Sequence, residues 1–117
     1  MDTYPLVNRC AVVVIPQAPF WTWVNKLGDL MGAAPIQQQN DSNIYLLPDY
    51  ESADDIYLAM KKYLDGHFED IFISELEAWS MDPLTFPEIT YDRFSEWFRV
   101  SSHTMIFDTV KKPLKRE

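Results

Sequence analysis

The chain of 117 residues has one cysteine, two histidines and three glycines. A single cysteine excludes an internal disulfide, and so few cysteines and histidines exclude a zinc site of ordinary ligand spacing. No apolar run approaches the roughly 18 residues that a membrane-spanning helix needs, and no basic segment followed by an apolar one opens the chain. We therefore expect a cytoplasmic protein with no metal, no cofactor and no membrane segment.

Signatures of catalysis and of nucleotide binding are also absent. The sequence contains no G-x-G-x-x-G, G-x-x-x-x-G-K-[ST], G-x-S-x-G or H-E-x-x-H. Three isolated glycines give little material for a backbone cradle around phosphate. These absences favour a binding protein over an enzyme, and they assign no catalytic residue.

Aromatic side chains are plentiful, with seven Phe, four Trp and six Tyr. A chain of this length and aromatic content can bury one substantial core without cross-links. We expect a single domain over residues 1–117, with a lead-in at 1–8 and a frayed basic tail at 111–117.

Charge is distributed unevenly along the chain, which has 18 acidic and 10 basic residues and a formal net charge of −8. Residues 49–96 contain 13 of the acids and only three basic residues, Lys61, Lys62 and Arg93. Such a field repels nucleic acid and anionic membranes and attracts a basic partner. Alternatively, the acids only keep the protein soluble.

The segment on which the fold depends is residues 10–15, six consecutive small or β-branched apolar residues between Arg9 and Pro16. An unbroken apolar run of this length predicts a strand buried on both faces, and therefore the central strand of a sheet. Residues 43–48 and 100–110 predict two further strands, whose polar residues tolerate an edge position.

Four helical segments are expected between these strands. The first begins at Pro19 and ends at Gly28, and an exposed loop covers residues 30–42. Ser52 is the expected N-cap of the second, which Asp65-Gly66 caps or kinks before a third helix over residues 67–79. That third helix is expected to keep its acids, Glu69, Asp70, Glu75 and Glu77, mostly outside its buried stripe. Thr90 is expected to cap a short fourth helix.

The expected fold is therefore α+β, a three-stranded sheet with the first strand central, packed with about four helices in a layered α/β sandwich. Helices must cover at least one face of the sheet. If they cover only one, a second copy of the chain is expected to close the other apolar face and form a homodimer.

Residues scattered over most of the chain give it a family resemblance. They are Asn8-Arg9, Pro16, Pro19-Phe20, Trp23, Asn25, Tyr45-Leu46-Leu47-Pro48, Ile71-Phe72, Glu75-Leu76, Trp79, Asp82-Pro83, Phe94, Glu96-Trp97-Phe98, His103 and Asp108. With these residues the chain resembles a family of small uncharacterised bacterial proteins. The resemblance implies a bacterial cytoplasmic setting and no particular activity, cofactor or ligand.

Three polar residues could line a ligand pocket or an active site. Arg9 opens the central strand, where a guanidinium can clamp a carboxylate or a phosphate. His103 could act as a general acid or base, although such a histidine more often bonds to the backbone. Asp82 belongs to a Pro-rich connector that could complete the pocket. Cys10 lies in the apolar run, which predicts burial and no reactivity.

Aromatic residues that fall off the helical stripes predict an interaction surface. Trp23, Trp79, Trp97, Phe72, Phe94 and Phe98 have the spacing of core residues. Trp21, Tyr50, Tyr57, Phe86 and Tyr91 lie off these stripes, several of them beside acids. They suit a basic, partly apolar partner, or they fold over the rim of the core.

Three functions follow from the sequence. The leading hypothesis is a small non-enzymatic protein-binding or regulatory domain whose acidic residues 49–96 engage a basic protein. The first alternative is a small enzyme or ligand-binding domain with a pocket near Arg9, His103 and Asp82. The second is a protein that associates with itself through the apolar face of its sheet.

Overall fold

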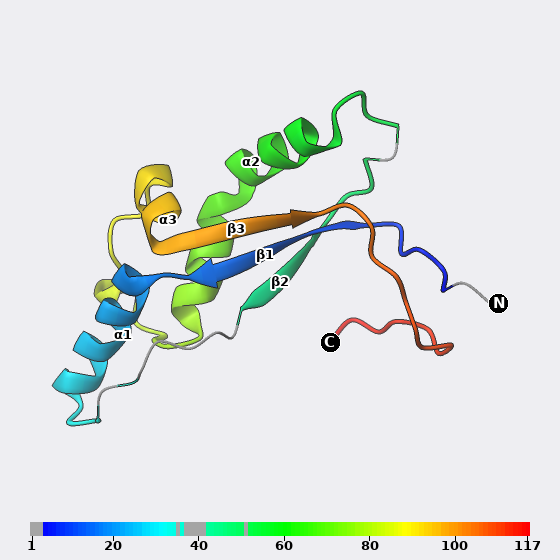
Figure 1. The fold of residues 1–117 in the computed structure, drawn as a ribbon. Helices are drawn as coiled ribbons and strands as arrows, with labels where there is room; N and C mark the ends of the chain where they lie inside the picture. The colour runs from blue at the N-terminus through cyan, green and yellow to red at the C-terminus, as the bar shows by residue number, and fades with distance from the viewer. Residues whose placement is uncertain (1–3, 35, 37–41, 51) are drawn as a thin grey trace.

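The computed structural model describes residues 4–34, 36, 42–50 and 52–117. Its elements follow in the order β1 (Cys10–Pro16), α1 (Ala18–Leu30), β2 (Asn43–Leu47), α2 (Ile56–Glu77), a 3₁₀ turn η1 (Pro83–Thr85), α3 (Tyr91–Trp97) and β3 (Phe98–His103) (Figure 1). The predicted α+β class is confirmed. The described part of the chain has three α-helices and one 3₁₀ turn, where about four helices were predicted.

The sheet has the strand order β2-β1-β3, which confirms the predicted central position of β1. Both neighbours pair with β1 in antiparallel fashion. Val12, near the middle of β1, lies opposite Tyr45 of β2 and Ser102 of β3. Because opposed residues of antiparallel strands point to the same face, this register fixes which side chains of the edge strands look inward.

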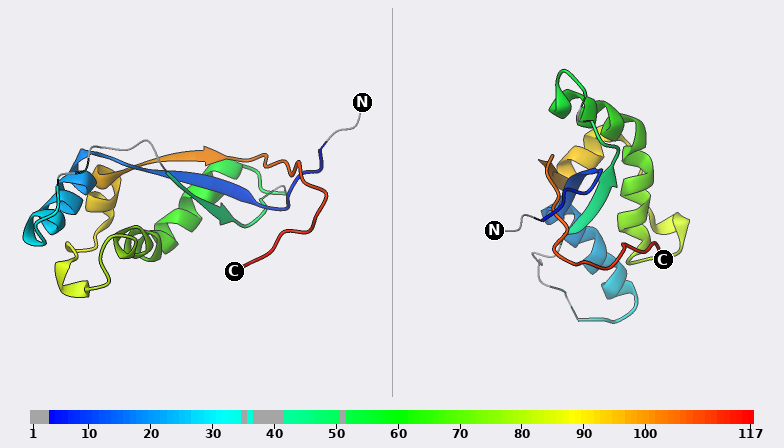
Figure 2. Two further views of the ribbon diagram at one scale, coloured as in Figure 1. Left: turned by 90° about the horizontal axis from the view of Figure 1, so that it is seen from below. Right: turned by 90° about the vertical axis from the view of Figure 1, so that its right-hand side faces the viewer.

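The helices cover one face of this sheet only. Cys10, Val12 and Val14 are buried in the common core, whereas Val13 and Ile15 on the other face are only half-buried. Figure 2 shows the helices gathered on one side of the three strands, with α1 extending beyond the end of the sheet. The described residues therefore form two layers.

Aromatic rings fill the space between the helices and the sheet. Phe72 of α2 lies at the centre, with ring centroids 5.8 Å from Phe94 and 5.4 Å from Phe98. Phe20 of α1 reaches the same cluster and lies 5.2 Å from Phe98. Offset and edge-to-face contacts at these separations add specific attraction to the burial of the rings, so the cluster ties all three helices to β3.

One helix replaces the two predicted for residues 52–79, so a helix cap at Asp65-Gly66, one of the two alternatives predicted there, is wrong. α2 runs without interruption from Ile56 to Glu77. A glycine within a helix costs only about 1 kcal/mol relative to alanine. Burial of Leu64 before Gly66 and of Ile71 and Phe72 after it outweighs that cost.

Other element boundaries also differ from the prediction. α1 continues past Gly28, its predicted end, to Leu30. Asp55, not Ser52, is the N-cap of α2, because its carboxylate accepts a hydrogen bond from Leu58 N at 3.1 Å. The last strand begins at Phe98, directly after α3, and ends at His103, short of the predicted 110. Beyond it, Phe107 forms only an isolated bridge with Leu6. The predicted loop at 30–42 lies partly outside the described residues.

Within the described part of the chain, no helix combines the length and apolar character needed to cross a bilayer.

Substitution of Gly66 by alanine tests the continuity of α2. The residue is exposed, its φ is not positive, and a Cβ there meets no atom within 4 Å. We expect Gly66→Ala to raise the free energy of unfolding by about 0.5 to 1 kcal/mol in urea titrations.

Gly32→Ala is the matched control, because Gly32 has a φ of +73° that alanine adopts only with strain. We expect that variant to lose stability. A loss of stability in Gly66→Ala would instead indicate a break in the helix at this position.

Candidate functional site

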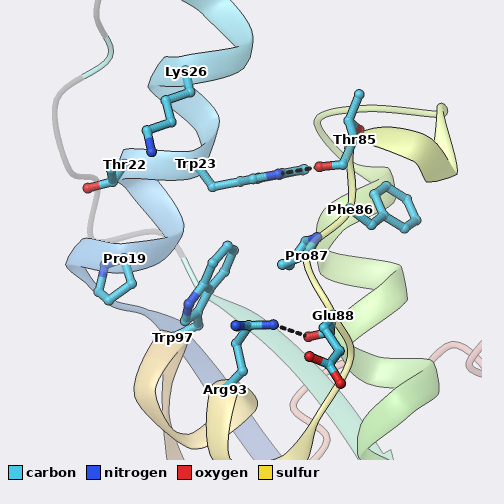
Figure 3. A pocket seen from close by; sticks show the side chains of 10 residues that line it. All are labelled: Pro19, Thr22, Trp23, Lys26, Thr85, Phe86, Pro87, Glu88, Arg93 and Trp97. Atoms are coloured by element: carbon cyan, nitrogen blue, oxygen red, sulfur yellow. Dashed lines mark hydrogen bonds between the residues drawn. The ribbon is translucent and has the colours of Figure 1, made fainter.

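A cleft of about 630 Å³ lies between α1, α3 and the connector at residues 85–88 (Figure 3). Its described lining combines aromatic rings, prolines and charged side chains. The lining residues are Pro19, Thr22, Trp23, Lys26, Thr85, Phe86, Pro87, Glu88, Arg93 and Trp97. The cleft therefore has both apolar walls and groups that can bind a charge.

Long-range contacts form the apolar walls. Trp23 Nε1 donates a hydrogen bond of 2.8 Å to the carbonyl oxygen of Thr85, 62 residues away, and so joins α1 to the connector. The Trp23 ring lies 6.3 Å from Trp97 and 6.4 Å from Phe86. Because each ring is held by neighbours on other elements, the walls exist before any ligand arrives.

The connector has its own hydrogen bonds. The Asp82 carboxylate accepts from Leu84 N at 3.0 Å, and Thr85 Oγ1 donates to the Asp82 carbonyl oxygen at 2.7 Å. Ser80 Oγ lies 2.9 Å from Thr85 Oγ1. These bonds fix Thr85 where its carbonyl oxygen meets Trp23, so the predicted site residue Asp82 supports the cleft wall by capping η1.

Two cations face the cleft from opposite ends. Figure 3 shows the Lys26 side chain pointing into it from α1 and the Arg93 guanidinium lying beneath Trp97. Arg93 Nη1 donates to the carbonyl oxygen of Glu88 at 2.8 Å. Among the described residues, the ion pair within 4.0 Å is Lys61–Asp65, so neither Lys26 nor Arg93 has a carboxylate at that distance.

The three polar residues expected to share a pocket lie apart. Arg9 lines a groove of about 480 Å³ whose other described residues include Tyr63 and Arg116 but neither His103 nor Asp82. His103, on β3, lies opposite Ala11 of β1, and the Nε2 atom of His103 lies 2.9 Å from Ser101 Oγ. Asp82 lies in the connector between α2 and η1, where its hydrogen bonds are to Leu84 and Thr85. These positions bring no catalytic pair together.

The predicted interaction aromatics have different environments. Trp21 is only 5% exposed, so its expected place on a surface is wrong. It follows Phe20 at the start of α1 and packs edge-to-face on Trp79 at 5.7 Å. Trp79, predicted to belong to the core, is 38% exposed. Phe20 packs on Phe98 of β3 and Trp21 packs on Trp79 after α2, so the start of α1 is buried on two sides. A helical stripe in the sequence predicts burial on one side only.

The remaining aromatics lie nearer to solvent. Tyr57 is 62% exposed on α2, and Tyr50 and Phe86 are half-buried. Tyr91 begins α3, where its ring packs edge-to-face on Phe68 at 5.3 Å and lies under Lys61 Nζ at 5.8 Å from the centroid. Of this group, Phe86 belongs to the cleft.

Sequence reasoning missed a buried carboxylate. Glu75 is only 2% exposed, although it was predicted to lie mostly outside the buried stripe of its helix. Its Oε2 accepts hydrogen bonds from Asn43 Nδ2 at 2.6 Å and from the Tyr45 hydroxyl at 2.7 Å. Asn43 and Tyr45 are two residues apart in β2 and so share its inner face. Two polar residues on the inner face of a strand need a hydrogen-bond partner in the core, and this spacing in the sequence could have predicted a buried acceptor such as Glu75.

Burial raises the pKa of Tyr45 well above its ordinary value, and the hydrogen bond to Glu75 raises it further. Both effects disfavour the phenolate, because it would be poorly solvated and would face a carboxylate. Tyr45 therefore remains a hydrogen-bond donor at alkaline pH values where an exposed tyrosine ionises, and the link between β2 and α2 persists there.

Metal-ligating side chains do not gather in the part of the chain that the structure describes, since no three or more His, Cys, Asp or Glu residues there form a group that could hold an ion. His67 Nδ1 lies 2.8 Å from the Tyr63 carbonyl oxygen, and its ring stacks on that of Tyr63. Cys10 is buried, as predicted.

Replacing Glu75 with glutamine tests the buried hydrogen bonds. We expect Glu75→Gln to lower the free energy of unfolding by about 1 to 3 kcal/mol, because bonds to a charged acceptor become bonds to a neutral one inside the protein. Urea titration of wild type and variant measures the difference.

Glu77→Gln is the control, since Glu77 is exposed two residues away on the same helix. We expect its stability to stay within about 0.5 kcal/mol of wild type. An equal decrease in the free energy of unfolding in both variants would contradict this, because it would mean that the hydrogen bonds of Glu75 add nothing beyond the loss of one negative charge.

Comparison with protein-family models, with curated proteins and with solved structures finds no match for this chain. The resemblance to a family of uncharacterised bacterial proteins stays a prediction. Functional conclusions must therefore come from the geometry of the chain.

Proposed function

We propose that this protein is a non-enzymatic protein-binding domain that docks a basic partner on its acidic helices. The observation that carries the proposal is the exposure of the acids in residues 49–96. Of the twelve acids there that the structure describes, eleven are exposed: Asp49, Asp54, Asp55, Asp65, Glu69, Asp70, Glu77, Asp82, Glu88, Asp92 and Glu96. Glu75 is buried, and Asp65 takes part in the ion pair with Lys61.

We call the exposed acids of the adjacent helices α2 and α3 the acidic helical surface; Asp70 lies at its edge, beside Tyr45 and Leu46 of β2. It consists of Asp65, Glu69, Asp70, Glu77, Asp92 and Glu96. The ring of Phe68 joins α2 to Tyr91 and Phe94 of α3, so the two helices lie side by side. Negative charge spread over adjacent helices gives a positive partner both attraction at long range and several alternative ion pairs.

Exposed tyrosines add apolar area beside this charge. Tyr57 is largely exposed near the start of α2, and Tyr91 is partly exposed where α3 meets it. Tyrosine supplies contact area together with a polar tip, a combination enriched at protein interfaces. The separation of Arg9, His103 and Asp82 also supports a binding role, because it removes the motive for an active site among them.

Neutralising acids on α2 tests the proposal. Glu69 and Glu77 are eight residues apart and so lie on the same outer stripe. We expect the double variant E69Q/E77Q to lose most of the basic proteins that immobilised wild type retains from a lysate of its own host at about 50 mM salt. Quantitative mass spectrometry measures retention.

The control D29N/E117Q removes the same number of charges outside residues 49–96, at two exposed positions. We expect it to retain the same partners as wild type, and we expect about 500 mM salt to release them. Retention that ignores salt, or that falls equally in both variants, would contradict the proposal.

A second candidate function is homodimerisation through the uncovered side of the sheet, which we call the open sheet face. Its residues, from the strand register, are Val13, Ile15, Ile44, Leu46, Arg99, Ser101 and His103; Ala11 shares this side of β1 but is buried. Ile44 is 65% exposed and Leu46 is 52% exposed. A sheet with one free face normally carries polar residues there, so an apolar row on β1 and β2 favours a covering partner.

Charge favours a second copy as that partner. The open sheet face carries no acid at any of its paired positions, and the helices that bear the acids lie on the other side of the sheet (Figure 2). Two copies can therefore pack face to face, about 10 Å apart, with their acidic helices pointing away from each other. Val13 is the middle residue of β1, so a two-fold axis through this face brings it close to its own copy.

A lysine at Val13 tests the dimer. We expect wild type to sediment as a dimer at about 100 µM and Val13→Lys to sediment as a monomer, because a dimer would bury two unpaired ammonium groups at its centre. Leu58→Lys, the same kind of change at an exposed apolar residue of α2, is the control and should remain dimeric. Circular dichroism checks that both variants fold. A monomeric wild type, or Val13→Lys sedimenting as wild type, would contradict the assignment.

A further inference from the structure

We propose that the cleft between α1, α3 and residues 85–88 is a binding site for a small organic anion with a flat apolar body, of the class of aromatic carboxylates. This site is separate from the acidic helical surface and takes a ligand of the opposite charge. The inference therefore goes beyond the proposed docking of a basic partner and does not depend on it.

Positive charge, which is scarce in this protein, is concentrated in the cleft. Outside the basic tail the chain has six basic residues, and the cleft contains two of them, Lys26 and Arg93. Neither has a carboxylate within ion-pair distance among the described residues. Two unpaired cations in one cleft of a protein with net charge −8 are available to an anion from solution.

Glu88 is the acid on the described lining, and it leaves the cations free. Its backbone carbonyl oxygen, and not its carboxylate, accepts the hydrogen bond from Arg93 Nη1. A guanidinium has five N–H donors, so this one bond positions Arg93 and leaves donors for a ligand. A carboxylate matches the planar fork of a guanidinium better than it matches the single point charge of a lysine, which places the anionic group of the ligand at Arg93.

The walls between the two cations are flat and apolar. Trp23 and Trp97, with Pro19 and Pro87, present flat apolar surfaces across the cleft (Figure 3). Trp97 is fixed by its contacts with Phe20 at 6.3 Å and Phe72 at 5.7 Å, and Trp23 is fixed by its bond to Thr85. A flat ring stacked on these surfaces would lose water from the face that contacts them, and the site would not have to deform.

The volume of the cleft and the absence of glycine from its described lining indicate which class of ligand fits. A cleft of about 630 Å³ suits a small molecule, since such sites commonly have about 300 to 1,000 Å³. Inorganic phosphate or a polyphosphate fits less well, because the described lining has no glycine among its residues and so no loop of the kind that surrounds phosphate with amides. Apolar walls with one guanidinium favour a single carboxylate on an aromatic body.

The test uses 2-naphthoate as the probe and neutral 2-naphthamide as its matched analogue, titrated into the ¹⁵N-labelled full chain and followed by NMR. We expect saturable shifts at the indole N–H signals of Trp23 and Trp97, and binding of the amide at least about tenfold weaker, since it lacks the charge that Arg93 recognises. Absence of saturable shifts up to about 10 mM probe, equal binding of the amide, or shifts confined to other parts of the chain would overturn the proposal.

Two variants, each with a matched control, test whether Arg93 and Lys26 bind the carboxylate of the probe. Arg93→Gln is expected to weaken naphthoate binding about tenfold or more, whereas Arg99→Gln, on the open sheet face, should leave it unchanged. Because Arg93 also holds the Glu88 carbonyl oxygen, Lys26→Gln provides an independent check with Lys62→Gln on α2 as its control. We expect Lys26→Gln to weaken binding severalfold. Equal loss in a variant and its control would mean general attraction to positive charge and would overturn the site.

Discussion

The inner face of β1 packs Val12 and Val14 into one buried cluster with Phe72 of α2, Phe94 of α3 and Phe98 of β3, and this contact decides where the other elements lie. Phe72 is fully buried within that cluster and touches the rings of Phe94 and Phe98, so α2 must cross the sheet on the side where those rings lie. With three helices committed to one face, the short chain leaves the other face of an equally apolar strand without a helix. The open sheet face is thus a direct consequence of how the core is filled.

The buried carboxylate of Glu75 attaches the edge strand β2 to α2. Leu47 is the one buried residue of β2, so this edge strand has little apolar area to hold it against α2. The bonds from Asn43 and Tyr45 to Glu75 supply that attachment. They also fix the register, because a slip of one residue would turn both donors to the open sheet face and leave the carboxylate buried without partners.

The sequence predicted the elements that are determined locally. The unbroken apolar run at residues 10–15 was sufficient to place β1 at the centre. The helix end predicted at Gly66 was wrong because tertiary packing on both sides outweighs a local propensity. The acid at Glu75 was misplaced because its donors come from a strand about 30 residues away. The cleft could not be predicted at all. Its walls meet through the bond between Trp23 and Thr85, a pairing that no pattern within either segment indicates.

This arrangement gives three surfaces of different character: the acidic helical surface, the open sheet face, and the cleft between α1, α3 and residues 85–88. The net charge of −8 alone would suggest a uniformly acidic molecule. The helices that bear the acids and the open sheet face lie on opposite sides of the sheet, so a partner docked on the outside of the helices leaves most of the open sheet face free. A face-to-face dimer would then carry two acidic surfaces directed outward. A basic partner with two docking segments could engage both, and the second contact would form at a high effective concentration. Dimerisation and docking would thereby reinforce each other although they share no residue, since the open sheet face supplies the copies and the helices supply the charge.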